Sequence, residues 1–183
     1  MDVGLFRKLN AVGMLAVCAV LAMAFYDQVL HHELPCPLCL LQRIGMVAVL
    51  CGLMLNVIRG PKPDHYSIMI IAAFFGGAVS LRQISLHIVP GTGAYGSTFF
   101  GMHYYTWAFL VFAVIILGTS TIAAYSTQYH KQHYLAFREQ SGIAKLAVVV
   151  TIALVMMNVV FTFAECGPLQ CPDNPTSYWL LGQ

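Results

Sequence analysis

Four of the six cysteines stand in two close pairs, Cys36 with Cys39 and Cys166 with Cys171. Cysteines this close in sequence can bond to each other or exchange a disulfide with another dithiol, and the thiolate is the attacking species. A disulfide across so few residues constrains the unfolded chain less than one that closes a long loop. Redox exchange is therefore favoured for the first pair. A zinc site is the main alternative, and two cysteines alone leave it incomplete.

The first pair lies in the segment LPCPLCLLQR, residues 34–43. Pro35 and Pro37 are tolerated at or before the first turn of a helix and disfavoured deeper inside, so the motif predicts that a helix begins there. A cysteine at that position meets unpaired backbone N–H groups and the positive end of the helix dipole. Both stabilise the thiolate over the thiol.

Arg43 follows Cys39 by four residues, which predicts that it lies on the same helix face one turn deeper. An arginine within an apolar segment is expensive in free energy and indicates a functional site. We expect Arg43 to bind an anionic oxygen beside the thiolate, such as a reduced quinone would present. The alternative is that its side chain extends outward to the lipid headgroups.

The second pair lies in the segment CGPLQCPDNP, residues 166–175. Glycine and proline between the cysteines permit the tight turn that a short disulfide loop needs, and three prolines keep the segment out of a helix. We expect a solvent-exposed pair that can meet a soluble partner, with a structural clip on the tail as the alternative. Cys18 and Cys51 fall within apolar stretches and are interpreted as small apolar residues.

The elements that carry these residues are predicted from composition: 59% of the chain is hydrophobic, 9% is charged and the mean hydropathy is +0.76. A soluble domain of this length would need more polar surface. Stretches long enough to cross a bilayer, roughly 20 residues each, occur at about 9–28, 40–58, 67–88, 103–125 and 145–164. They are solidly apolar rather than alternating, which excludes a barrel. The prediction is an all-α polytopic membrane bundle, with residues 1–183 as one integral-membrane domain.

The lysines and arginines predict the orientation of the bundle. Seven of the nine lie at the N-terminus or in the second and fourth connections, namely Arg7, Lys8, Arg59, Lys62, Lys131, Arg138 and Lys145. The positive-inside rule places these segments in the cytoplasm, so that both cysteine pairs face the exterior, where disulfides persist. The exceptions, Arg43 and Arg82, lie within apolar stretches. A basic patch for nucleic acid and a phosphate-binding glycine motif are both absent from the sequence, which argues against those functions.

The N-terminal segment has a second interpretation. Arg7 and Lys8, an apolar run and then Ala22-Met23-Ala24 are similar to a signal peptide with a cleavage site. We favour an uncut membrane anchor. With cleavage, four helices would remain and residues 27–39 would still face the exterior.

Two further groups of side chains stand near the motif. An aromatic group opens the fourth apolar stretch: His103, Tyr104, Tyr105 and Trp107. An interfacial aromatic belt explains this group better than a quinone pocket. A polar group precedes the motif: His31, His32 and Glu33. It could tune the acidity of the cysteines or carry a proton, although a solvated loop is the favoured interpretation.

The P-C-x-x-C-x-x-x-R spacing of residues 35–43, on the second helix of a small bundle, resembles the DsbB (disulfide bond formation protein B) family of bacterial inner-membrane proteins. A weaker similarity is the segment of residues 82–86 followed by Pro90. The resemblance implies a relay in which a reduced, periplasmic thioredoxin-like protein (DsbA-like) attacks a loop disulfide and leaves oxidised. Electrons would then pass to Cys36 and Cys39 and on to ubiquinone or menaquinone near Cys39 and Arg43. It also implies that Cys39 faces the quinone while Cys36 exchanges with the second pair.

The chain departs from the family pattern in one respect. Typical members carry their second cysteine pair in a long loop between the third and fourth helices, whereas residues 89–102 here are glycine-rich and contain no cysteine. A fifth helix instead brings Cys166 and Cys171 to the predicted exterior face. We interpret them as a relocated shuttle pair, on a DsbB-like four-helix core with one additional transmembrane helix. The alternative function is a membrane scaffold or metal-binding protein with two structural disulfides.

Overall fold

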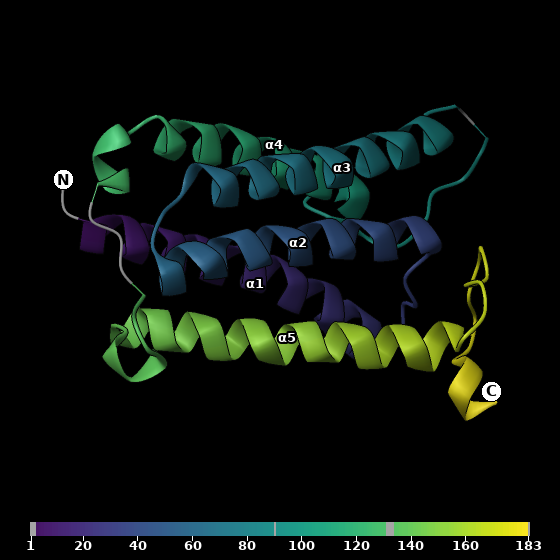
Figure 1. The fold of residues 1–183 in the computed structure, drawn as a ribbon. Helices are drawn as coiled ribbons and strands as arrows, with labels where there is room; N and C mark the ends of the chain where they lie inside the picture. The colour runs from purple at the N-terminus through teal and green to yellow at the C-terminus, as the bar shows by residue number, and fades with distance from the viewer. Residues whose placement is uncertain (1–2, 90, 131–133, 183) are drawn as a thin grey trace.

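The computed structural model describes residues 3–89, 91–130 and 134–182, and five long helices dominate this part of the chain (Figure 1). Their bounds are α1 (Val3–Leu30), α2 (Pro37–Arg59), α3 (Pro63–His87), α4 (Tyr104–Ala123) and α5 (Gly142–Cys166). The smaller elements are the antiparallel strands β1 (Thr98–Phe99) and β2 (Met102–His103) and the 3-10 helices η1 (Ser126–Tyr129), η2 (Phe137–Glu139) and η3 (Trp179–Leu181). The prediction of an all-α bundle is confirmed.

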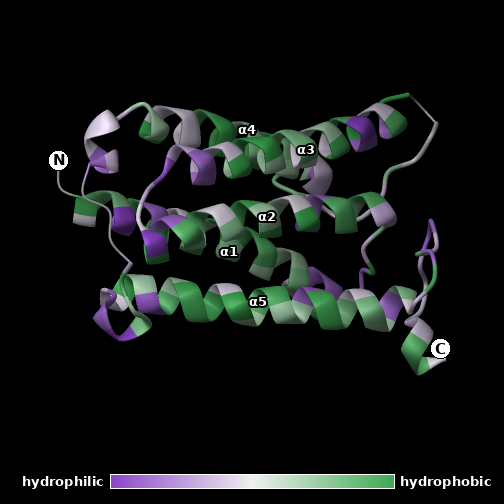
Figure 2. Ribbon diagram, in the orientation of Figure 1, coloured by the Kyte–Doolittle hydropathy of each residue, from purple (hydrophilic) through white to green (hydrophobic). Residues whose placement is uncertain are grey.

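All five helices are long and apolar enough to cross a membrane, which fits a multi-pass membrane protein. Figure 2 shows apolar residues along the spans and most hydrophilic residues near their ends. Helices α1, α3 and α5 begin three to six residues before the predicted apolar stretches. Pro63 stands in the first turn of α3, and the Ser141 side chain accepts a hydrogen bond from the Ala144 N–H at the start of α5. Polar residues and proline are favoured at the first positions of a helix but are not apolar, so a span predicted from hydropathy does not include them.

Helix α2 lies at the centre of the bundle, between α1 and α3. Helix α4 packs on α3 and α5 packs on α1, so α4 and α5 lie on opposite sides of the molecule (Figure 1). Glycines allow close approach on the α4 side. A Cβ on Gly76 would overlap the ring of the fully buried Phe112, and a Cβ on Gly45 would lie 3.1 Å from the Gly76 Cα. Small residues at helix contacts are characteristic of packing within membranes.

A buried polar network joins the helices at the end of the bundle that holds the N-terminus. Asn56 Nδ2 donates to Asn10 Oδ1 at 2.9 Å, and Asn10 Nδ2 donates to the Tyr66 hydroxyl at 3.0 Å. The Tyr66 hydroxyl in turn donates to Gln128 Oε1 at 2.7 Å. These bonds connect α1, α2, α3 and η1, and because each polar group has a partner the network stabilises that end of the bundle.

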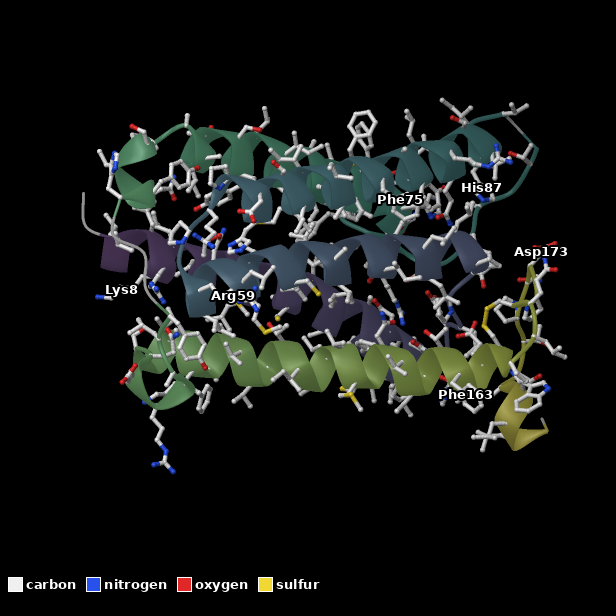
Figure 3. All side chains as sticks on the ribbon, viewed as in Figure 1. Lys8, Arg59, Phe75, His87, Phe163 and Asp173 are labelled. Carbon is white, nitrogen blue, oxygen red and sulfur yellow. A yellow bond between two sulfur atoms is a disulfide. The ribbon has the colours of Figure 1, made fainter. Side chains whose placement is uncertain are left out.

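The two ends of the bundle differ in what they carry. The N-terminus and the connections from α2 to α3 and from α4 to α5 lie at one end, where Figure 3 also shows Lys8 and Arg59. The connections from α1 to α2 and from α3 to α4 and the C-terminal tail lie at the other end, with His87 and Asp173. Both cysteine pairs belong to this second end, because one opens α2 and the other closes α5.

Candidate redox site

The first cysteine pair forms the start of α2, as the prolines of the motif predict. Cys36 is the N-cap residue, Pro37 stands in the first turn, and the Cys36 sulfur accepts a hydrogen bond from the Cys39 backbone N–H at 3.2 Å. Both cysteines are free thiols in the structure; Cys36 is buried and Cys39 is partly buried. The pair is therefore held at the N-terminus of α2, where the backbone N–H groups without helical partners lie.

Gln83 of α3 bridges the two sulfurs. Its Nε2 donates to Cys36 Sγ at 3.3 Å and to Cys39 Sγ at 3.5 Å. Its Oε1 accepts from Gln42 Nε2 at 2.7 Å, which fixes the orientation of the amide. Gln83 was not predicted as a site residue, although a polar side chain near the end of an apolar helix is a signal of such a role. An amide donor aimed at sulfur stabilises a thiolate more than a thiol.

The two thiols differ in acidity. The pKa of Cys36 is raised above its usual range, mainly because its side chain is hydrogen-bonded to Cys39 and also because it is buried. Cys36 therefore keeps its proton when Cys39 ionises. The arrangement leaves one thiol protonated and one sulfur able to act as the nucleophile.

Arg43 lies one turn below Cys39 and is buried inside the bundle. Its Nη1 donates to Gln28 Oε1 at 2.6 Å, its Nη2 donates to the Ala24 carbonyl at 3.1 Å, and its guanidinium lies 4.8 Å from the centre of the Phe25 ring. The side chain thus points toward α1 and does not extend to the headgroups. A buried guanidinium held in this way is a preorganised cation.

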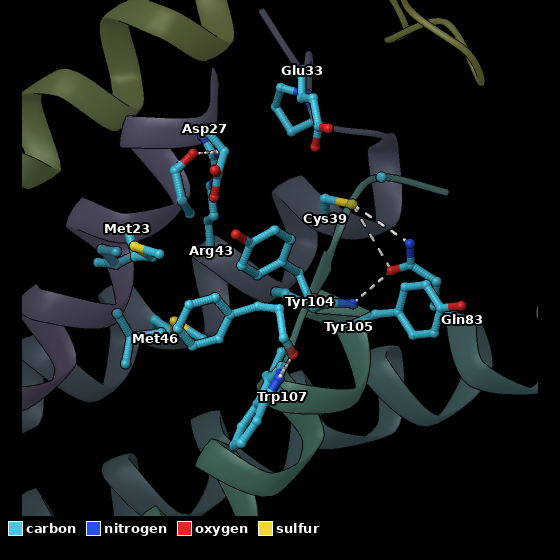
Figure 4. A pocket seen from close by; sticks show the side chains of 18 of the residues that line it. Met23, Asp27, Glu33, Cys39, Arg43, Met46, Gln83, Tyr104, Tyr105 and Trp107 are labelled. Atoms are coloured by element: carbon cyan, nitrogen blue, oxygen red, sulfur yellow. Dashed lines mark hydrogen bonds between the residues drawn. The ribbon is translucent and has the colours of Figure 1, made fainter. Parts of the chain in front are cut away.

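A cavity of about 270 Å³ opens between α1, α2, α4 and the segment that leads into β1 (Figure 4). Cys39 and Arg43 lie on its α2 wall and Asp27 on its α1 wall. The rest of the lining is mostly apolar and includes Met23, Met46, Ala108 and Val111. An apolar cavity with a few convergent polar groups is the usual form of a small-molecule site.

The aromatic group at the start of α4 also faces the cavity. Tyr104, Tyr105 and Trp107 line it, a role that the interpretation as an interfacial belt did not include. Trp107 Nε1 donates to the Phe99 carbonyl at 2.8 Å, which ties the β1–β2 hairpin to α4 beside the cavity. The belt and the cavity wall cannot be distinguished by sequence, since both need aromatic residues at the same membrane depth.

The second pair forms a disulfide, Cys166 to Cys171, directly after α5. The expectation of a solvent-exposed pair is wrong for Cys166, which is only 5% exposed because it is the last residue of a packed helix. Cys171 lies in the following turn and is partly exposed. Gly167 takes a positive φ of +63°, and a Cβ there would lie 2.6 Å from the Trp179 ring. The tail therefore folds back over the turn that carries the disulfide.

The comparisons with known proteins concern the first half of the chain. The family model for Disulfide bond formation protein DsbB matches residues 6–95. Over these residues the chain is similar to the DsbB family. The match includes Cys36, Cys39, Arg43 and Gln83 and thus the whole α2–α3 part of the redox site.

Curated relatives agree with this assignment. Disulfide bond formation protein B of Chromobacterium violaceum is 39% identical over 80 residues, which cover 41% of this chain and 48% of that protein. The protein of the same name from Xanthomonas euvesicatoria pv. vesicatoria is 36% identical over 91 residues, covering 46% and 52%. The chain therefore spans about half the length of the curated relatives it matches. No solved structure matches it.

Helices α4 and α5 and the second cysteine pair lie outside the residues that match DsbB. Glu165 connects this part to the DsbB-matching part, because it interacts electrostatically with Arg43 and Cys39. Its carboxylate is buried, and neither oxygen has a hydrogen-bond partner among the described residues. Glu165, the residue before Cys166, is thus close enough to the first turns of α2 to interact with them electrostatically.

Proposed function

We propose that this protein is a membrane thiol:quinone oxidoreductase that re-oxidises a periplasmic thioredoxin-like dithiol protein, of the DsbA type, and so supports disulfide formation in other proteins. Electrons would leave through Cys36 and Cys39 to ubiquinone or menaquinone. The observation that carries the proposal is that Cys39 and Arg43 share one wall of a cavity inside a membrane bundle, with the second sulfur of the pair beside them.

The cavity fits a quinone. Tyr104, Tyr105 and Trp107 offer flat apolar faces for a ring, and Arg43 is a fixed cation for a carbonyl oxygen that becomes anionic. A bound quinone would supply an acceptor for two electrons and two protons. Cys39 would lie beside it, and Gln83 would hold the Cys39 sulfur in place through the 3.5 Å hydrogen bond.

The first pair, Cys36 and Cys39, would work through the unequal acidity of its two thiols. Cys36 keeps its proton because its pKa is raised, so Cys39 is the sulfur that ionises toward the cavity. Closing the Cys36–Cys39 bond oxidises two thiols to one disulfide and releases two electrons and two protons. Cys36 is the member of the pair that would exchange with the second disulfide.

The second pair, Cys166 and Cys171, is the outer pair of the relay and would receive electrons from the soluble partner. A thiolate of the partner attacks one sulfur of the Cys166–Cys171 bond; Cys171 is the more accessible of the two. That bond breaks, the second thiol of the partner resolves the mixed disulfide, and the partner leaves oxidised. The outer dithiol then reduces the Cys36–Cys39 disulfide and is itself oxidised again.

The orientation follows from charge. We infer a location in the bacterial inner membrane with the N-terminus in the cytoplasm, because Lys8 and Arg59 lie at the end of the bundle opposite both cysteine pairs. Both pairs would then face the oxidising periplasm.

The test uses purified protein in detergent, mixed with quinone and a reduced thioredoxin-like protein, with quinone absorbance and free thiols followed together. One quinone should disappear for each partner dithiol oxidised, and Cys36→Ser should abolish the reaction. Quinone reduction that survives Cys36→Ser would overturn the proposal. An unchanged rate in the Cys166→Ser/Cys171→Ser double variant would reduce the second pair to a structural clip.

A further inference from the structure

Asp27 is a buried carboxyl on the cavity wall that the proposed relay does not yet use. Its side chain is 8% exposed, and its Oδ2 has no hydrogen-bond partner among the described residues. Figure 4 shows it on the same cavity as Arg43, Cys39 and Tyr104. A buried carboxylate oxygen without a hydrogen-bond partner is unfavourable, so this oxygen is suited to interact with a group bound in the cavity.

The other oxygen of Asp27 leads to solvent. Oδ1 lies 2.9 Å from Nδ1 of His31, one turn further along the same helix end. The His31 side chain is 54% exposed, at the end of the bundle that carries both cysteine pairs. A histidine ring can donate a proton from one nitrogen and accept one at the other, which suits it to a relay. A path thus leads from solvent to the cavity, first through His31 and then through Asp27.

The second carboxylate on the cavity wall differs. Glu33 Oε2 accepts hydrogen bonds from the Ser97 backbone N–H and from its hydroxyl, each at 3.2 Å. Glu33 therefore anchors the segment before β1. Among the described residues Asp27 Oδ2 has no such anchoring bond, and the Tyr104 side chain is the group from α4 that interacts with the Asp27 carboxyl. The charged and titratable groups of other elements that line the cavity with Asp27 are Arg43 and Cys39 of α2, Tyr104 and Tyr105 of α4, Tyr95 and Glu33.

The redox chemistry creates a need for such a group. Oxidising the cysteine pair releases two electrons and two protons, and reducing a quinone takes up two of each. The Cys36 thiol still holds one of these protons. If Cys39 has already ionised, its proton has gone to solvent, and one proton must return to the buried cavity from outside.

We propose that His31 and Asp27 are the proton-entry route to the cavity, with Asp27 Oδ2 as the final donor and His31 reloading it from water. This inference rests on the proposed function. It adds two residues whose work is proton transfer and does not alter the path of the electrons. Asp27 would then be a catalytic residue and His31 a relay behind it.

The first experiment uses Asp27→Asn and His31→Asn, with Asp64→Asn and His32→Asn as controls. Asp64 is an exposed aspartate at the opposite end of the bundle, and His32 is an exposed histidine beside His31. Asp27→Asn should slow quinol formation about 100-fold, the scale of general-acid catalysis, and small weak acids such as formate should restore part of the rate. Exchange between the two cysteine pairs, measured without quinone by thiol trapping, should keep its wild-type rate.

The outcomes separate the two proposals. A wild-type protein that forms no quinol overturns the proposed function itself. A wild-type protein that forms quinol while Asp27→Asn forms it equally fast overturns only the proton route. Loss of rate without rescue by weak acids, or equal losses in His31→Asn and His32→Asn, also contradicts the route.

A second readout needs no quinone. Infrared difference spectra between the dithiol and disulfide forms should contain the band of a protonated carboxyl that is absent in Asp27→Asn and present in Asp64→Asn. In D2O this band should shift at once in the wild type and several-fold more slowly in His31→Asn. A band that persists in Asp27→Asn, or exchange that is equally fast in His31→Asn, would contradict the assignment.

Discussion

Arg43 and Gln28 are joined by a 2.6 Å hydrogen bond that links α2 to α1 behind the cavity. Gln28 Nε2 also donates to the Tyr178 hydroxyl at 3.2 Å, and Tyr178 belongs to the tail that follows the second disulfide. A single amide thus contacts both the cation on the cavity wall and the segment that carries the outer cysteine pair. Arg43 is consequently positioned by protein groups before any ligand arrives, which lowers the free-energy cost of binding.

Replacing Arg43 by alanine should weaken quinone binding at least tenfold, because a hydrogen bond to a charged group contributes about 1.5–3 kcal/mol. Partner oxidation in a single turnover should change far less, since it depends on the outer disulfide. Arg82→Ala is the matched control: Arg82 is the other arginine within an apolar span and is exposed. Quinone titrations and stopped-flow thiol assays measure the two effects. Equal losses in both assays would count against the role of Arg43.

Replacing Gln83 by leucine removes the donor that both sulfurs share. The Cys39 thiolate should become less stable, so alkylation of Cys39 near neutral pH should slow by about tenfold, as expected for the loss of one charge-assisted hydrogen bond. Ser85→Ala is the control, because the Ser85 hydroxyl binds only the Leu81 carbonyl of its own helix. Mass spectrometry of the alkylated peptide gives the rate. A Gln83→Leu rate equal to that of Ser85→Ala would show that the bridge has no effect on reactivity.

The acidity of Cys36 gives a prediction with a definite sign. Its pKa is raised chiefly by the hydrogen bond with the Cys39 side chain, so its thiol stays protonated to higher pH than an ordinary cysteine. Cys39→Ala removes that cause, and the pKa of Cys36 should fall. Alkylation of Cys36, followed against pH, should therefore begin at lower pH in Cys39→Ala than in the wild type. The free cysteine Cys51 provides the control, since Cys51→Ala should leave the Cys36 profile where it was.

Two adjacent glycines of α3 test the packing of the bundle. A Cβ on Gly76 would overlap the Phe112 ring, whereas a Cβ on Gly77 would lie at an ordinary 3.6 Å from Phe112 Cβ. Gly76→Ala should lower the free energy of unfolding by about 1–3 kcal/mol through overpacking, and Gly77→Ala should change it little. Thermal unfolding in the same detergent compares them. Equal stability of the two variants would mean that α3 and α4 do not approach as closely as described.

The fold was predictable because a membrane span is a local property of the sequence. An apolar run of sufficient length identifies a helix wherever its neighbours lie, and the five spans were found in that way. The starts of α1, α3 and α5 were not found in that way, because polar residues or proline precede the apolar run, as Lys8, Pro63 and Ser141 do.

The same distinction between local sequence and tertiary packing applies to the site. Cys36, Cys39 and Arg43 lie on one helix, so their spacing predicts their grouping without tertiary information. Gln83 reaches the same sulfurs from α3, a contact that depends on how two helices pack. The burial of Cys166 likewise depends on where the end of α5 rests, which sequence distance does not reveal.

Electron exchange between the two cysteine pairs is tested most directly by disulfide mapping of the double variants Cys39→Ala/Cys171→Ala and Cys39→Ala/Cys166→Ala. Each variant leaves Cys36 with one cysteine of the second pair and removes both thiols that would otherwise break a bond between them. The protein is oxidised, its free thiols are alkylated, and its linked peptides are identified by mass spectrometry. If the pairs exchange, Cys36 is recovered joined to Cys166 or to Cys171 in at least one of the two variants. Recovery of Cys36 only as an alkylated thiol in both variants would contradict the exchange.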